Sequence, residues 1–203
     1  MRHAMHPRAL RQRGVVLIFT LIILLILTIG AVALMRSMNT SLTSAGNLAF
    51  RRDLANQGEQ AVSNVMTAFK ASGALSTSAV TDSNVPANNY SATMLATNAQ
   101  GVPNILLSGD STFNATGFTS SANDIAGATS DIVIRYVIDR MCTAAGATVA
   151  NQCVQSSAAP LGGTANGSQS VTPPAATVYR LSVRVTGARS TQVFLQTTFT
   201  RQD

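Results

Sequence analysis

Tryptophan is absent from this sequence, and the side chains from which catalytic and metal sites are built are scarce. Both histidines, His3 and His6, fall in the first ten residues, and Glu59 is the single glutamate. Metal sites need several His, Cys, Asp or Glu ligands at short spacing, and no such cluster occurs. No glycine-rich phosphate loop follows a predicted strand either. We therefore expect no metal, no cofactor and no catalytic residues; an enzyme would need a centre built from seven scattered aspartates.

Charge is also scarce, at 11% of residues, and the net charge of +6 is concentrated at the amino terminus. Four arginines and no acidic residue precede Gly14. From Val15 onward ten basic residues stand against eight acidic ones, which leaves a net charge of +2. Binding to nucleic-acid phosphates requires a broad basic surface, so we expect no nucleic-acid partner. No motif identifies a small-molecule substrate.

A long apolar run follows the arginines. Val15–Leu34 holds 20 residues without a charge, and only two threonines and one glycine interrupt it. As a helix it would be about 30 Å long, enough to cross the hydrocarbon core of a bilayer. By the positive-inside rule its amino-terminal end should face the cytoplasm, with the rest of the chain outside.

A cleaved secretory signal is a second interpretation of the same run. The apolar core of such a signal is usually shorter, about 7–15 residues, and ends at a small-x-small site. Ala31-Val32-Ala33 offers such a site. Cleavage after Ala33 would remove the helix and release a soluble periplasmic or surface binding module. An uncleaved anchor without further processing is a third interpretation.

The chain turns polar after Met35 without a helix breaker. No proline occurs between Pro7 and Pro86. Apolar residues recur at mostly three- and four-residue spacing, which is typical of an amphipathic helix. We expect one helix to continue to about Ala71, where Ser72-Gly73 is a stop signal. The predicted apolar stripe consists of Met38, Leu42, Ala45, Ala49, Ala55, Val62, Val65, Met66 and Phe69.

The charged residues along this part of the helix are expected to be hydrated or locally paired. Glu59 lies on or beside the stripe, and Arg51, Arg52 and Asp53 precede it. Exposed ion pairs contribute only about 0–1 kcal/mol, so a salt bridge from Glu59 to a neighbouring subunit is the less favoured interpretation.

Strands are predicted near the carboxyl terminus. Asp131–Arg140 and Val178–Thr186 both alternate apolar and other residues with period two. A turn at residues 187–190 and a last strand, Thr191–Thr200, complete a hairpin. We expect three antiparallel strands covering one side of the long helix, with their spaced arginines facing solvent. Residues 72–130 predict mostly loop, with a short strand at Asn104–Leu107.

Cys142 and Cys153 are the only cysteines, eleven positions apart. If the head lies outside the cytoplasm, we expect them to form a disulfide, which would contribute about 2–3 kcal/mol by closing the loop. A pair of free thiols is the alternative for a cytosolic protein. A metal would need more ligands than these two.

The amino-terminal junction RQRGVVLIFTLIILLILTIGAVALMRS resembles the class III leader and first helix of type IV pilins. In that family a prepilin peptidase cuts after the glycine, on the cytoplasmic face. The resemblance implies a cut between Gly14 and Val15, with Val15 as the mature and often methylated terminus. A basic residue before the glycine, here Arg13, also fits.

One position departs from the family pattern. Major pilins usually carry glutamate at the fifth mature position, where this chain has Phe19. A buried carboxylate in a helical bundle is costly unless it is paired, so its absence implies that the subunit does not need that partner. In the family this absence is typical of a minor subunit placed at a tip.

The carboxyl-terminal runs IRYVIDRMCTAAGA and YRLSVRVTGARSTQVFLQTTF are similar to the end of PilX-type pilus assembly proteins. The resemblance covers both ends of the chain and not the middle. It implies an α+β, type IV pilin-like fold, in which a long helix packs against an antiparallel head. The parts would be a leader (1–14), a transmembrane segment (15–35), an amphipathic periplasmic segment (36–72) and the head (73–203).

The implied function is structural. A minor pilin primes pilus assembly with other minor and major pilins, and ends at or near the tip, where it supports adhesion or twitching motility. It would be stored in inner-membrane lipid with its head in the periplasm, be processed by prepilin peptidase, and then join the extracellular pilus. A pseudopilin of a type II secretion system is the alternative in the same class, although tip-like pseudopilins tend to be larger.

Overall fold

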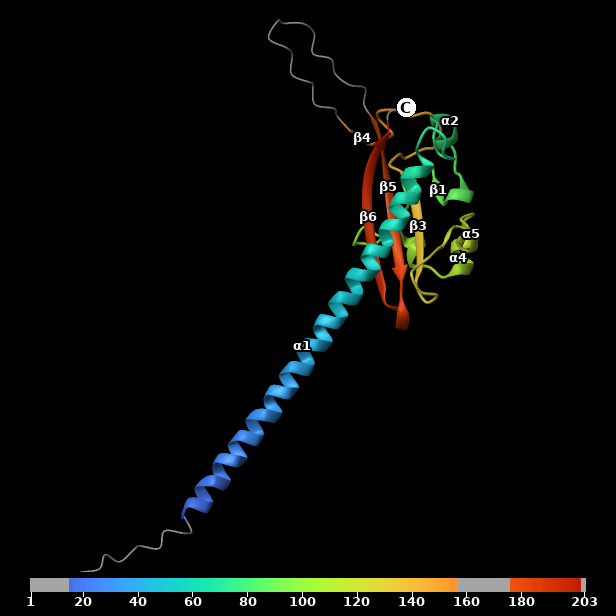
Figure 1. Ribbon diagram of the computed structural model, residues 1–203. Coiled ribbons are helices and arrows are strands. Elements are labelled where there is room, and N and C mark those ends of the chain that lie inside the picture. The colour runs from blue at the N-terminus through green and yellow to red at the C-terminus, as the bar shows by residue number, and fades with distance from the viewer. Residues whose placement is uncertain (1–14, 157–175, 202–203) are drawn as a thin grey trace, which may run out of the picture. The chain divides into compact units, whose positions relative to one another are not determined.

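The computed structural model describes residues 15–156 and 176–201, as one long helix and a mixed sheet. The chain forms two compact units, one up to Phe50 and one from Arg51. Helix α1, Val15–Ala68, contains every described residue of the first unit and continues into the second (Figure 1). It ends close to the predicted Ala71. The second unit, here called the head, contains the end of α1 and every strand of the described residues.

The head is α+β. Besides α1 it holds short helices and a six-stranded sheet. The strands are β1 Tyr90–Ser91, β2 Ile125–Ala126, β3 Val133–Arg140, β4 Gln155–Ser156, β5 Ala176–Thr186 and β6 Gln192–Arg201. The helices are α2 Ser78–Thr81, α3 Asn104–Leu107, α4 Asp110–Ala115 and α5 Ser120–Asn123, with 3-10 turns η1 Pro86–Asn88 and η2 Ala188–Ser190.

The three long strands confirm the predicted strands and hairpin. β5 lies between β3 and β6 and is antiparallel to both, so that Tyr136, Val183 and Leu195 are aligned across the sheet. The expectation of a purely antiparallel head was wrong, because β1 pairs with β3 in parallel. A two-residue strand has no periodicity from which its presence or direction could be predicted.

The predicted strand at Asn104–Leu107 is also wrong, since these residues form helix α3. Pro103 stands just before it, and the Leu106 N–H donates to the Pro103 carbonyl. Leu106 is buried and the adjacent Leu107 is exposed. Four apolar residues are too few for periodicity to distinguish a helical turn from a strand.

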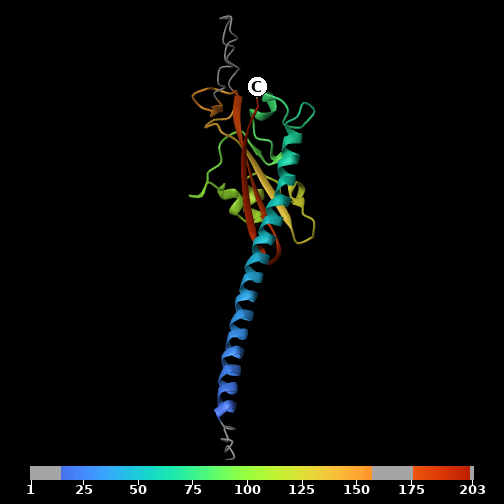
Figure 2. The ribbon, with the colours of Figure 1, turned by 60° about the vertical axis from the view of Figure 1, so that its left-hand side comes forward.

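The end of α1 packs along one face of the sheet (Figure 2). Its buried residues are Leu54, Gly58, Ala61 and Val65, at spacings of four, three and four. Of the predicted stripe only Val65 is buried, Val62 and Met66 beside it are half-buried, and Met38 and Leu42 are exposed. The charged residues Glu59 and Arg51–Asp53 are exposed.

Gly58 sets how closely α1 approaches the sheet. A β-carbon at this position would lie 2.6 Å from Leu195 Cδ1 and 3.0 Å from Val185 Cγ2. Glycine is unfavourable inside a helix by about 1 kcal/mol relative to alanine. The close approach explains why glycine occupies this position.

We predict that Gly58→Leu destabilises the head by about 1–3 kcal/mol, because the larger side chain forces α1 away from β5 and β6. The measurement is denaturant unfolding of the full chain in detergent micelles, followed by near-ultraviolet circular dichroism. The matched control on the same helix is Gly46→Leu, since nothing lies within 4 Å of a β-carbon at Gly46. Equal stability of the two variants would contradict the packing argument.

Candidate functional site

The first part of α1 carries apolar side chains on every side. All large apolar residues from Val15 to Met35 are exposed in the structure. Thr20 and Thr28 interrupt them, but the hydroxyl of each donates to a helix carbonyl three residues earlier, at 2.9 and 2.8 Å. No unsatisfied side-chain polar group would therefore have to enter an apolar medium. By length and composition, α1 is apolar enough to cross a membrane.

The predicted processing site lies at the beginning of this helix. Val15 is the first residue of α1, and Gly14 and the leader 1–14 lie outside the described residues. Phe19, at the position of the missing glutamate, is 62% exposed on the helix surface. The segment consequently presents no acidic side chain that could pair with an amine of a neighbouring chain.

The predicted disulfide is present, between Cys142 and Cys153. It follows β3 directly, and next to it the Val154 N–H donates to the Met141 carbonyl at 2.8 Å. No free cysteine remains. The bridge closes the loop 142–153, which contains no helix or strand of its own.

Arg140 fixes this loop to the rest of the head. Its side chain is 1% exposed. The guanidinium donates to the Ala92 carbonyl at 3.2 Å, to Asp82 Oδ1 at 2.9 Å and to the Gly146 carbonyl at 2.6 Å. One buried cation thus joins three segments that are far apart in the sequence, and Asp82 partly neutralises its charge.

The expectation that the strand arginines face solvent is wrong. Arg135, Arg140 and Arg180 are all buried, and Arg184 is half-buried. The alternation itself is as predicted: one face of β3 and β5 is apolar and packs on α1. Arg135, Asp139, Arg180 and Arg184 lie on the other face, which the segment 92–124 covers with α3, α4 and α5. Arg140 is aligned with Tyr179 and therefore lies at the end of the α1 face.

Asp139 and Arg180 form the central pair on that covered face. They are aligned across β3 and β5, and Arg180 donates to both oxygens of Asp139, at 3.0 and 2.5 Å. The pair also binds both backbone groups of Leu95. The Leu95 N–H donates to Asp139 at 2.8 Å, and its carbonyl accepts from Arg180 at 3.1 Å.

Arg135 and Arg184 hold the other end of the covering segment. Arg135 donates through two nitrogens to Asp124, and a third nitrogen lies 2.7 Å from Asp110. The bond to Asp124 raises the pKa of Arg135. Arg184 donates to the carbonyls of Leu106 and Ser108, and burial, together with the nearby Arg135, lowers its pKa.

Around these ions lies a small apolar cluster of Leu106, Phe113, Phe118 and Val137. The Arg135 guanidinium stacks over the Phe113 ring at 4.8 Å. No signal in the sequence identified the partners of Arg135, because Asp110 in α4 and Asp124 just after α5 contact a strand that local spacing does not specify.

Tyr90 belongs to a cluster of aromatic rings just beyond the end of α1. Phe69 lies 5.0 Å from Tyr179 and 4.9 Å from Phe199, between ring centres. Tyr90 is fully buried, and its hydroxyl donates to the Thr81 carbonyl at 2.7 Å. Burial, reinforced by Tyr179, raises the pKa of Tyr90 far above its ordinary value.

No group of three or more potential metal ligands occurs among residues 15–156 and 176–201. Comparisons of the chain with protein-family models, with curated proteins and with solved structures found no match. Two features of the chain itself bear on its function: the apolar first part of α1, and a head stabilised by a disulfide and buried ion pairs.

We predict that Asp139→Ala destabilises the head by about 3–5 kcal/mol, because it leaves the Arg180 cation buried without its counter-ion. Adding Arg180→Met to this variant should restore part of the loss. The measurement is denaturant unfolding of the full chain in detergent. Asp131→Ala, at an exposed carboxylate, is the control and should stay within about 0.5 kcal/mol of the wild type. An equally small effect of Asp139→Ala would show that the pair is not a structural element.

We also predict that the head loses stability at alkaline pH and that the buried hydroxyl of Tyr90 causes part of this loss. The folded chain keeps Tyr90 protonated, whereas the unfolded chain ionises it near its ordinary pKa of 10.0. The free energy of unfolding should therefore fall as the pH rises above that value. In Tyr90→Phe this fall should be shallower, although the variant loses about 1 kcal/mol at neutral pH with the hydrogen bond to Thr81. Unfolding midpoints across a pH series measure both effects, and equal slopes would contradict the assignment.

Proposed function

We propose that the chain is a structural, non-catalytic subunit of the type IV pilin kind, a minor pilin that helps to prime pilus assembly and lies at or near the pilus tip. The observation that carries the proposal is the junction at Gly14. An arginine-rich segment ends in glycine, and at the next residue begins a helix that is apolar on all sides for 20 residues. The same helix continues to Ala68 and ends packed on a sheet.

Two physical properties support this function. A helix that is apolar all round can be stored in inner-membrane lipid, and its side chains can later pack against other helices. A disulfide and buried ion pairs fasten the head from within, which suits a periplasmic and then extracellular domain. Phe19, in place of an acidic residue, favours a minor position in which no neighbour's terminal amine has to be neutralised.

Two alternatives differ from this proposal, one in the partner machinery and the other in the site of cleavage. A pseudopilin of a type II secretion system would share the processing at Gly14 and differ in its partner machinery. A secreted binding module would be cut after Ala33. Against the second stands the length of the apolar run, since Val15–Leu34 holds 20 residues and the apolar core of a cleaved signal usually has about 7–15.

We predict that the mature protein begins at Val15 in cells that contain a prepilin peptidase and keeps its leader in cells without it. The measurement is mass spectrometry of the amino terminus from a membrane fraction. Gly14→Val should block processing, whereas the control Ala33→Val should leave it unchanged. A start at Leu34 would overturn the proposal in favour of a secreted module, and an intact leader in the presence of the peptidase would overturn the pilin assignment.

A further inference from the structure

Strand β6 forms an open edge of the sheet. It has 10 residues, and among the described residues its only strand partner is β5. The strand contains no proline or lysine, two of the residues that commonly blunt such edges. Backbone N–H and C=O groups along its outer side are therefore available to pair with a further strand.

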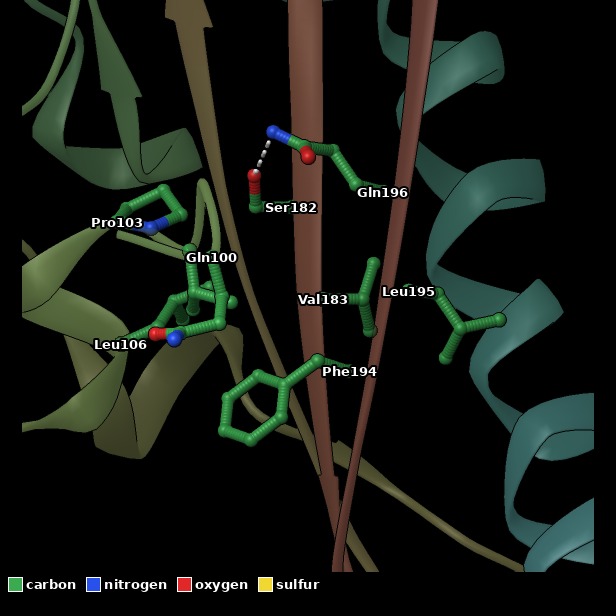
Figure 3. A pocket seen from close by; sticks show the side chains of 9 residues that line it. Gln100, Pro103, Leu106, Ser182, Val183, Phe194, Leu195 and Gln196 are labelled. Carbon is green, nitrogen blue, oxygen red and sulfur yellow. Dashed lines mark hydrogen bonds between the residues drawn. The ribbon is translucent and has the colours of Figure 1, made fainter. Parts of the chain in front are cut away.

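A cavity lies on each side of this edge. The first, of about 250 Å³, is on the face away from α1 (Figure 3). Phe194 and Gln196 of β6 form one wall, and the segment around Pro103 and Leu106 forms the other. The Gln196 amide donates to Ser182 Oγ at 3.4 Å. The wall residues are apolar or uncharged, so this cavity suits an apolar side chain.

The second cavity, also about 250 Å³, is on the α1 side of the same edge. It lies between Glu59 and Val62 of the helix and Leu195 and Thr197 of the strand. Glu59 is exposed, and no ion pair joins it to any residue in the part of the chain that the structure describes. The only charge in the cavity wall is therefore an unneutralised carboxylate.

We propose that β6 binds an extended strand of a partner polypeptide, which carries a lysine or arginine toward Glu59 and large apolar residues toward Phe194. Successive side chains of a strand point to opposite faces. Phe194 lines only the first cavity and Thr197 only the second, whereas Leu195 and Gln196 between them line both. A strand added beside these residues therefore runs past both cavities and places alternate side chains toward each. Backbone pairing supplies affinity, and the two cavities select the sequence.

A second copy of this chain does not meet the requirement. Arg201 is the only charged residue of β6, and it stands at the end of the strand, where its guanidinium donates to the Leu75 carbonyl at 2.7 Å. Pairing of two β6 strands would bring this arginine beside Glu59 only if it gave up its bond to the Leu75 carbonyl. The inference does not depend on the proposed function, because it uses only residues of the head.

The test is binding of a fluorescent capped peptide of about eight residues, the length of an ordinary strand. One central lysine is flanked by two leucines, and the remaining residues are threonine. Fluorescence anisotropy with the full chain in detergent micelles should show saturable binding. A peptide with glutamate in place of lysine should bind at least about fivefold more weakly, as should a peptide with threonine in place of the leucines.

Charge exchange provides the matched control. Glu59→Lys should weaken the lysine peptide and strengthen the glutamate peptide. Because Glu59 is exposed on α1, this change should leave the fold intact. Thr198→Pro should abolish binding of both peptides, because proline has no N–H to donate to an added strand. The Gly187 N–H donates to the Thr191 carbonyl, and hydrogen-bonded and non-hydrogen-bonded pairs alternate from there along β5 and β6. Thr198 falls in a non-hydrogen-bonded pair, so its N–H points outward, away from β5.

Three outcomes would overturn the inference: no binding of the lysine peptide, equal binding of both peptides to the wild type, or undiminished binding to a folded Thr198→Pro chain. Each is independent of where the amino terminus is processed. Failure of this inference and failure of the pilin assignment are therefore distinguishable.

Discussion

The head depends on one constraint: β3 and β5 are covered on both faces by the same chain, so alternate residues have to satisfy two different environments. One face meets α1 through apolar side chains such as Leu181 and Val185, which need no partner. The other meets a segment that is rich in small polar residues and whose buried apolar side chains include Leu106, Phe113 and Phe118. Buried charges on that face can persist only if the covering segment supplies counter-ions and carbonyl oxygens.

The covering segment supplies them at separate points along its length. Asp110 and Asp124 accept from Arg135, the Leu95 backbone joins the Asp139–Arg180 pair, and carbonyls at the end of α3 accept from Arg184. Desolvation of these groups offsets much of their attraction, so they add little net stability. They join the covering segment to the strands at separate points from Leu95 to Asp124.

The sequence predicted the elements that have a period. The alternation in Asp131–Arg140 and Val178–Thr186 gave the strands, the hairpin and the side-chain faces correctly. It could not show that the arginines are buried. A strand with arginines on one face has the same sequence pattern whether these side chains face water or a carboxylate from a distant part of the chain. The four-residue α3 and the two-residue β1 are too short to carry a period. Gly58 gave no signal either, since its role is a close approach to strands more than 120 positions away in the chain.

Helix α1 shows how one element is adapted to two surroundings by composition alone. Its first 20 residues are apolar in every direction, which suits lipid or a bundle of helices. From Leu54 onward four residues on one side of the helix are buried, and the opposite side is polar. The head therefore needs only the last part of the helix. If the first part served the fold of the head as well, its apolar residues would be restricted to one face. Their presence on every face indicates that the surroundings that cover them are not part of this head.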